Sequence, residues 1–279
     1  MFRPIPKIYA APLMALLLCV IVRPGLAAPP DTKEHQLMDA IWHGEAATAA
    51  ILIKQGVNVN VVEDRELNKG MTPLMEAAYV GQTQVARMLI DAGAKINIRD
   101  RTKYSVGMTA LAWSVIGMGP NKPEATALLL LHGADAEAKD EYERTALMYA
   151  GAEGSPACVL ALLKGGVKMD TIYGGDTPLT YTAMAGRFDN VTVLVHHGAG
   201  VNQTRSDKWT PLMCVIGADP GHQDPKGFAL QQAEAVKVLL NAGADVKAAN
   251  DKSRTALSYA TEGHLAAVVD LLRKAGAKN

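Results

Sequence analysis

A short segment recurs along most of the 279-residue chain. Each copy opens with Thr, then Pro or Ala, then Leu, and it closes with a Gly that follows two helix-length apolar stretches. In four of the six clear copies this Gly stands 21 residues after the opening Thr. Self-similarity at a fixed period predicts a solenoid, in which stacked units bury a continuous core. The opening residues are Thr72, Thr109, Thr145, Thr177, Thr210 and Thr255, and the closing residues are Gly93, Gly133, Gly166, Gly198, Gly243 and Gly276.

Each copy is predicted to form a helical hairpin. The opening Thr can cap the first helix, because its hydroxyl accepts hydrogen bonds from the free amides of the first turn. A Pro just inside suits a helix start, and the closing Gly supplies the left-handed residue that ends the second helix. An earlier, less regular copy runs from Leu37 through Gly44 to Gly56, which gives seven units. One hairpin cannot bury its apolar face alone, so we expect stability to come from the row.

These copies resemble ankyrin repeats, whose pattern is a Thr-Pro-Leu-His opening, an Ala pair, a Gly-His, a Leu pair and a Gly-Ala-Asp-Val-Asn close. The resemblance covers residues 36–279, and it implies an all-α ankyrin-repeat solenoid of about seven helix-turn-helix units joined by β-hairpin-like fingers. The units are expected near residues 36–60, 70–98, 107–138, 143–170, 175–202, 208–247 and 253–279. The matching residues include Thr72-Pro73-Leu74, Ala77-Ala78, Gly93-Ala94, Asn97, Gly263-His264, Leu271-Leu272 and Gly276-Ala277.

One position departs from the family pattern. The fourth residue of the opening is usually His, which in the family hydrogen-bonds across neighbouring turns. Without it, the array is expected to be held together more by apolar packing. The residues found there are Met75, Ala112, Met148, Thr180, Met213 and Ser258.

Residues 1–28 differ from the rest of the chain. Arg3 and Lys7 precede the largely apolar run Ile8–Val22, and small residues follow at positions 26–28. This order predicts a Sec signal peptide, and hence a periplasmic or secreted protein with no membrane insertion after cleavage. The apolar run is short for a bilayer span, which needs about 20 residues, but an uncleaved inner-membrane anchor is the alternative. Residues 29–35 are expected to form a short linker.

The charge balance and the motifs argue against several function classes. The 28 basic and 28 acidic residues give no excess of positive charge for a nucleic acid. The chain has no nucleophile elbow, no phosphate-binding glycine loop and no His-Glu-x-x-His pattern. Asp219, His222 and Asp224 could hold a divalent metal, but loop chemistry explains them at least as well. We therefore expect a monomeric, non-enzymatic protein without cofactor or metal.

The two cysteines beyond the predicted signal peptide are Cys158 and Cys214. Two repeats separate them, and helices stack about 8–10 Å apart, so they are too distant for a disulfide, which needs Cα atoms within about 7 Å. We predict unpaired thiols in the core. The alternative function is an accessory factor for a redox or peroxide-defence enzyme, in which Cys158 or Cys214 would be a sensing thiol.

The resemblance implies a concave face made of fingers and first helices, and the large aromatic residues fall there. Trp, Tyr, Met and Arg dominate interface energies, so this face is the predicted binding surface for another protein. The function expected is to bind and to regulate or protect that partner. The alternative is that these side chains fit only in the roomier inner layer. The predicted binding residues are Met71, Tyr79, Met108, Trp113, Tyr142, Arg144, Tyr149, Tyr173, Tyr181, Trp209, Arg254 and Tyr259.

Added segments are a second indication of specificity. Two fingers are longer than the others and contain residues 61–69 and 100–106. Two hairpin turns are predicted to be expanded, at residues 117–123 and 218–232. Insertions in repeat proteins commonly lie on one face and carry function.

Overall fold

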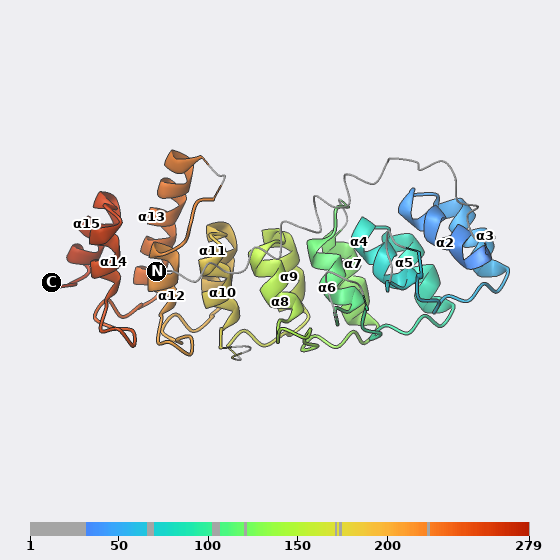
Figure 1. Ribbon diagram of the computed structural model, residues 1–279, viewed down its shortest axis with the longest axis horizontal. Coiled ribbons are helices and arrows are strands. Elements are labelled where there is room, and N and C mark those ends of the chain that lie inside the picture. The colour runs from blue at the N-terminus through green and yellow to red at the C-terminus, as the bar shows by residue number, and fades with distance from the viewer. Residues whose placement is uncertain are drawn as a thin grey trace. The chain divides into compact units, whose positions relative to one another are not determined.

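The computed structural model describes residues 32–65, 70–101, 107–119, 122–170, 172, 175–221 and 224–278. The predicted signal peptide, Tyr173 and His222 lie outside these residues. The chain divides after Tyr142 into two compact parts, which we call the N-terminal and C-terminal blocks. Each block is a stack of helical hairpins, shown in Figure 1.

The N-terminal block contains repeats 1 to 3. Its first helices, α2, α4 and α6, pack against one another in order, and its second helices form a second layer behind them. The first repeat begins at Lys33 instead of residue 36, because Thr32 caps α2 by accepting from the His35 amide. The hairpins are α2 (Lys33–Trp42) with α3 (Ala46–Lys54), α4 (Pro73–Val80) with α5 (Thr83–Asp91), and α6 (Ala110–Ile116) with α7 (Lys122–Leu131).

The C-terminal block contains repeats 4 to 7 in the same two-layer arrangement. Its hairpins are α8 (Ala146–Ala152) with α9 (Pro156–Lys164), α10 (Pro178–Met184) with α11 (Phe188–His196), α12 (Pro211–Ile216) with α13 (Pro225–Asn241), and α14 (Ala256–Glu262) with α15 (Ala266–Lys274). The all-α solenoid of seven hairpins is thus confirmed. No helix in the described part of the chain is long and apolar enough to cross a membrane.

The opening threonines cap the first helices as predicted. Thr145, for example, accepts from the Met148 amide at 3.4 Å, and Thr210 accepts from the Met213 amide at 3.2 Å. Thr109 is the exception, since its side chain makes no capping bond. Capping of this kind stabilises a helix by about 1 kcal/mol.

The residues at the position where the family usually has His contribute to the structure in two ways. Met75, Met148 and Met213 are 1% exposed and contribute to the core. Thr180 and Ser258 complete a reciprocal cap, because their hydroxyls accept from the amides of Thr177 and Thr255 at 2.9 and 3.1 Å. Met75 also does so, because its Sδ accepts from the Thr72 amide at 3.4 Å.

The fingers are narrow hairpins held by a few backbone bonds. In the N-terminal block the Asp100 amide donates to the Met108 carbonyl at 2.8 Å, and in the C-terminal block the Asn250 amide donates to the Arg254 carbonyl at 3.0 Å. Successive fingers are joined by single bonds, such as that from the Ser206 amide to the Gly175 carbonyl at 2.9 Å. Among the described residues the hairpins are too short to form strands, and the bridge between Ala249 and Thr255 is isolated.

Asparagine side chains tie one repeat to the next at the base of the fingers. Asn60 donates to the Gly93 carbonyl at 3.1 Å and accepts from the Lys95 amide at 2.7 Å. Asn202 makes the same two contacts with Gly243 and Asp245. Each amide thereby satisfies a donor and an acceptor of the neighbouring turn.

The insertion predicted at residues 218–232 is only partly an expanded turn. Residues 225–232 are helical and lengthen α13 at its start. Asp224 caps this helix by accepting from the Gly227 amide at 2.6 Å, and Pro225 occupies its first turn. The extension packs inward through Phe228, whose ring lies 5.0 Å from that of Phe188, and Gln232 donates to the Val215 carbonyl. The N-cap residue Asp224 and Pro225 in the first turn therefore start a helix here, although the residues before them favour a turn.

Candidate protein-binding surface

Most of the predicted binding residues are buried, which corrects the expectation of an open aromatic groove. Tyr142 is 53% exposed, Trp209 and Arg254 are half-buried, and Tyr173 lies outside the described residues. Residues this deeply buried offer a partner almost no surface, so they serve the fold first. The eight buried residues are Met71, Tyr79, Met108, Trp113, Arg144, Tyr149, Tyr181 and Tyr259.

In the N-terminal block, aromatic rings fill the space between successive first helices. The Trp42 and Tyr79 rings stack with centroids 6.3 Å apart, and Tyr79 meets Trp113 edge-on at 5.4 Å. Trp113 also donates from Nε1 to Asp100 Oδ2 at 2.8 Å. The alternative interpretation, that the inner layer is where large rings fit, is correct for these residues.

Trp209 and Arg254 remain partly accessible in the fingers of the C-terminal block, and both contact the buried Tyr259 of α14. We call these three residues the Trp209–Arg254 cluster. The Trp209 and Tyr259 rings lie 4.6 Å apart, and the Arg254 guanidinium carbon lies 4.0 Å from the centre of the Tyr259 ring. Asn250 donates to the Tyr259 hydroxyl at 2.8 Å, which fixes the ring from behind. The arrangement presents an indole and a guanidinium, the side chains most common at binding hot spots.

Charged groups surround this cluster. Arg254 pairs with Glu262, and Lys208 Nζ lies 3.3 Å from Asp251 Oδ1. Deeper in the block, Arg205 Nε lies 2.7 Å from Asp176 Oδ1. Burial raises the pKa of Asp176, and Arg205 opposes that rise. The surface therefore combines an aromatic centre with a rim of mixed charge, as protein interfaces do.

Two other carboxyls are perturbed by burial. The pKa of Asp100 is raised to about 7 by burial, against its bonds from Trp113 and the Met108 amide, and nearby Asp140 raises it further. Burial also raises the pKa of Glu153 to about 7, and Arg144 and Arg187 oppose this effect. Asp100 accepts from Trp113 and from the Met108 amide, and Glu153 lies near Arg144 and Arg187, so both are interpreted as part of the scaffold.

Comparison with known proteins decides the family. A model described as ankyrin repeats in three copies matches residues 14–100 and 37–140, and a model of a single ankyrin repeat matches residues 174–206. The chain belongs to the ankyrin-repeat family. SAT10, an ankyrin repeat domain-containing protein of Stachybotrys chartarum, is 35% identical to it over 150 residues. That stretch is 53% of this chain but only 7% of SAT10, so the likeness concerns the repeats alone.

Solved ankyrin-repeat structures cover most of this ankyrin-repeat protein. The ankyrin repeat domain of Bcl-3, a member of the IkappaB family, aligns with a TM-score of 0.66 at 25% identity over 88% of this chain and 100% of its own. The human ASB11 domain gives 0.68 at 25% identity over 87% and 98%. A domain from Acinetobacter baumannii gives 0.61 at 28% identity over 74% and 98%. Ankyrin repeats are typically non-enzymatic modules that bind other proteins, and their presence makes this chain a protein-interaction scaffold.

The cysteines of this ankyrin-repeat protein are unpaired and buried, as predicted. Both are 0% exposed, and burial raises the pKa of the Cys214 thiol. A sensing thiol needs access and thiolate character. The geometry thus counts against the redox alternative.

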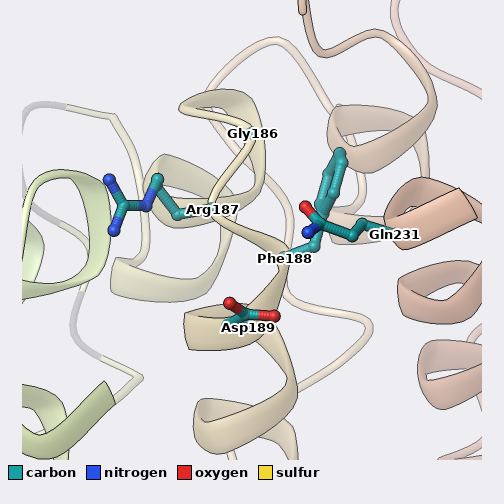
Figure 2. Close-up of a pocket in the computed structure, with 5 residues that line it drawn as sticks. All are labelled: Gly186, Arg187, Phe188, Asp189 and Gln231. Atoms are coloured by element: carbon teal, nitrogen blue, oxygen red, sulfur yellow. The ribbon is translucent and has the colours of Figure 1, made fainter. Parts of the chain in front are cut away.

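Sequence reasoning missed a hollow beside the lengthened α13. It has a volume of about 340 Å³ and is lined by Gly186, Arg187, Phe188, Asp189 and Gln231. Figure 2 shows Arg187 pointing away from Gln231, and its guanidinium donates to the Gly154 carbonyl at 3.1 Å. The insertion at residues 218–232 was the one sequence feature that could have indicated this hollow. The hollow forms because the insertion packs against the turn of repeat 5, and the sequence does not give that contact.

Proposed function

We propose that this ankyrin-repeat protein is exported and acts outside the cytoplasm as a monomeric scaffold that regulates or protects a partner protein. Support for export comes from residues 1–28, where basic residues, a short apolar run and small residues follow one another. The observation that carries the binding role is the Trp209–Arg254 cluster, which keeps hot-spot side chains accessible while most other aromatic residues are buried.

The partner contacts the indole of Trp209 and the guanidinium of Arg254, whose positions are fixed before binding. The Asn250 and Glu262 contacts hold the Tyr259 ring and Arg254 in place. Side chains that are ordered in advance lose little conformational entropy on association, so more of the contact energy appears as affinity.

Capture of the partner tests this proposal. The tagged chain is recovered from the exported fraction, its N-terminus is determined, and proteins that co-purify are identified by mass spectrometry. We expect cleavage close to residue 28 and one specific partner, whose affinity falls at least tenfold in Trp209→Ala, since a hot-spot truncation costs about 2 kcal/mol or more.

The matched control is Lys237→Ala, which removes an exposed side chain from α13 of the same repeat. This variant should retain the partner at wild-type affinity. Retention of the chain in the cytoplasm would contradict export, and equal capture by Trp209→Ala would contradict the binding surface.

A further inference from the structure

A second hollow lies in the N-terminal block, between the start of α2 and the first long finger. It has a volume of about 290 Å³, and its lining includes Glu34, His35, Val61, Val62 and Asp64. The finger segment belongs to the longer connection before Thr72, one of the insertions noted in the sequence. An element added to the repeat therefore forms one wall of the hollow.

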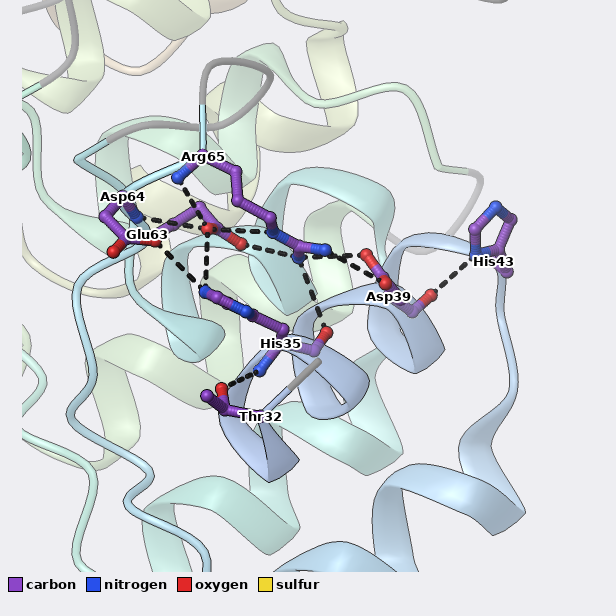
Figure 3. Close-up of polar contacts among 7 residues, drawn as sticks. All are labelled: Thr32, His35, Asp39, His43, Glu63, Asp64 and Arg65. Atoms are coloured by element: carbon purple, nitrogen blue, oxygen red, sulfur yellow. Dashed lines mark hydrogen bonds and ion pairs between the residues drawn. The ribbon is translucent and has the colours of Figure 1, made fainter. Parts of the chain in front are cut away.

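Ion pairs hold this finger against α2, as Figure 3 shows. Arg65 donates from Nη2 to Glu63 Oε2 at 2.7 Å and from Nη1 to Asp39 Oδ2 at 3.0 Å. His35 Nε2 lies 3.0 Å from Asp64 Oδ1, which places the Asp64 carboxylate at the rim. These contacts hold Asp64 and Arg65 in place before a ligand binds.

Some of the acidic side chains around the hollow have a basic partner among the described residues and others do not. Glu63, 4% exposed, is balanced by Arg65. Asp64 is paired only with His35 among the described ion pairs, and its side chain is 80% exposed. Glu34 accepts from the Asn58 amide at 3.4 Å. Two carboxylates thus face the hollow without an arginine or lysine from the described part of the chain.

The other wall is apolar. Val61 and Val62 line the hollow, and Val62 is 45% exposed. An anionic rim next to an aliphatic wall complements a lysine or arginine side chain, which carries its charge on a long apolar stem.

We propose that this hollow binds a basic side chain of a partner protein, with the stem against Val61 and Val62 and the cation beside Glu34 and Asp64. His35 is a positioning residue that holds Asp64. The inference rests on the proposed binding function, but it concerns a surface distinct from the Trp209–Arg254 cluster, so each can fail alone.

A metal ion is a less suitable occupant. One ligand atom each from His35, Glu63 and Asp64 lies within 4.8 Å of the others. However, Glu63 Oε1 already accepts from the Asp64 and Arg65 amides and from Arg65 Nε, and Oε2 accepts from Nη2. A metal would have to displace the guanidinium, and this would leave Arg65 without its principal partner.

The test uses two blocked tripeptides, Ac-Gly-Arg-Gly-NH2 and the same peptide with citrulline, an uncharged isostere of arginine. Each is titrated into the full chain to about 10 mM, a range that detects a Kd near 1 mM. The valine methyl signals are followed by NMR, with Val62→Ala used to assign Val62. We expect a saturable shift of Val62 with the arginine peptide and at least fivefold weaker binding of the citrulline peptide.

Two variants test whether binding depends on the carboxylates of the hollow or on the overall charge of the chain. Asp64→Asn should weaken binding of the arginine peptide at least threefold. Because the Asp64 side chain is 80% exposed, the variant should keep the wild-type far-ultraviolet circular dichroism spectrum. Asp91→Asn, an exposed acid on α5, should leave the affinity unchanged. Three results would overturn the proposal. The first is an equal shift with both peptides, and the second is no shift of Val62. The third is zinc binding that Asp64→Asn abolishes while the arginine peptide does not bind.

Discussion

Individual side chains of the same type have different roles in this protein, according to their neighbours. Trp113 is 6% exposed and donates to Asp100, whereas Trp209 is half-buried and shares its face with Arg254. The sequence places Trp113 in a first helix and Trp209 at the end of a finger, both on the predicted binding face. Only the packing between repeats decides which indole is left for a partner, so burial could not be predicted from spacing.

Asp100 gives a residue-scale prediction about pH. Its pKa is about 7 in the folded chain, compared with about 3.9 for an unfolded aspartate. At pH values between about 3.9 and about 7, Asp100 is protonated in the folded chain and ionised in the unfolded chain. The stabilisation is complete below about pH 4 and is lost as pH rises through about 7, so the free energy of unfolding should fall between about pH 5 and 8.

Urea unfolding of Asp100→Asn measures this contribution. Because the amide does not ionise, the loss of stability between about pH 5 and 8 should be smaller than in the wild type by about 1–3 kcal/mol. Glu153 leaves a residual slope of the same sign. Asp91→Asn serves as the exposed control. Identical slopes in the wild type and Asp100→Asn would show that Asp100 is ionised normally.

At the scale of elements, the helices begin where local chemistry predicts. Seven hairpins, the Thr caps of repeats 2 and 4 to 7 and the closing glycines follow from residue types at fixed spacing, and these features depend on contacts within a few residues. The extension of α13 was not predicted, since Asp224 and Pro225 were interpreted as turn residues although they also form a helix start. The hollow at α2 joins residues 29 positions apart, beyond the reach of any local pattern.

A pair of cap substitutions tests the element-scale account. Thr145 caps α8 through the Met148 amide, whereas Thr109 makes no such bond, and both residues are buried. Thr145→Ala should lower the free energy of unfolding by about 1 kcal/mol more than Thr109→Ala does, because only the former loses a capping bond. Thermal or urea unfolding of both variants is the measurement. Equal losses would indicate that burial of the Thr methyl, rather than capping, sets the cost.

At the scale of the whole molecule, the chain is a protein-interaction scaffold whose repeats supply stability, and we propose that its finger surfaces supply recognition. The family and the solenoid were predictable because a repeated sequence encodes a repeated unit. Eight of the twelve predicted binding residues are buried, so the surface that we propose is limited to the accessible ones. Specificity in repeat proteins lies in surface side chains, which follow no general code.

Hydrogen–deuterium exchange of the chain with and without its captured partner tests the central claim most directly. The account predicts slower exchange in the finger segments 205–209 and 250–254 of the C-terminal block, which carry Trp209 and Arg254. The second helices α11 and α13 should exchange at unchanged rates. Protection confined to those second helices, with the fingers unaffected, would contradict recognition through the Trp209–Arg254 cluster.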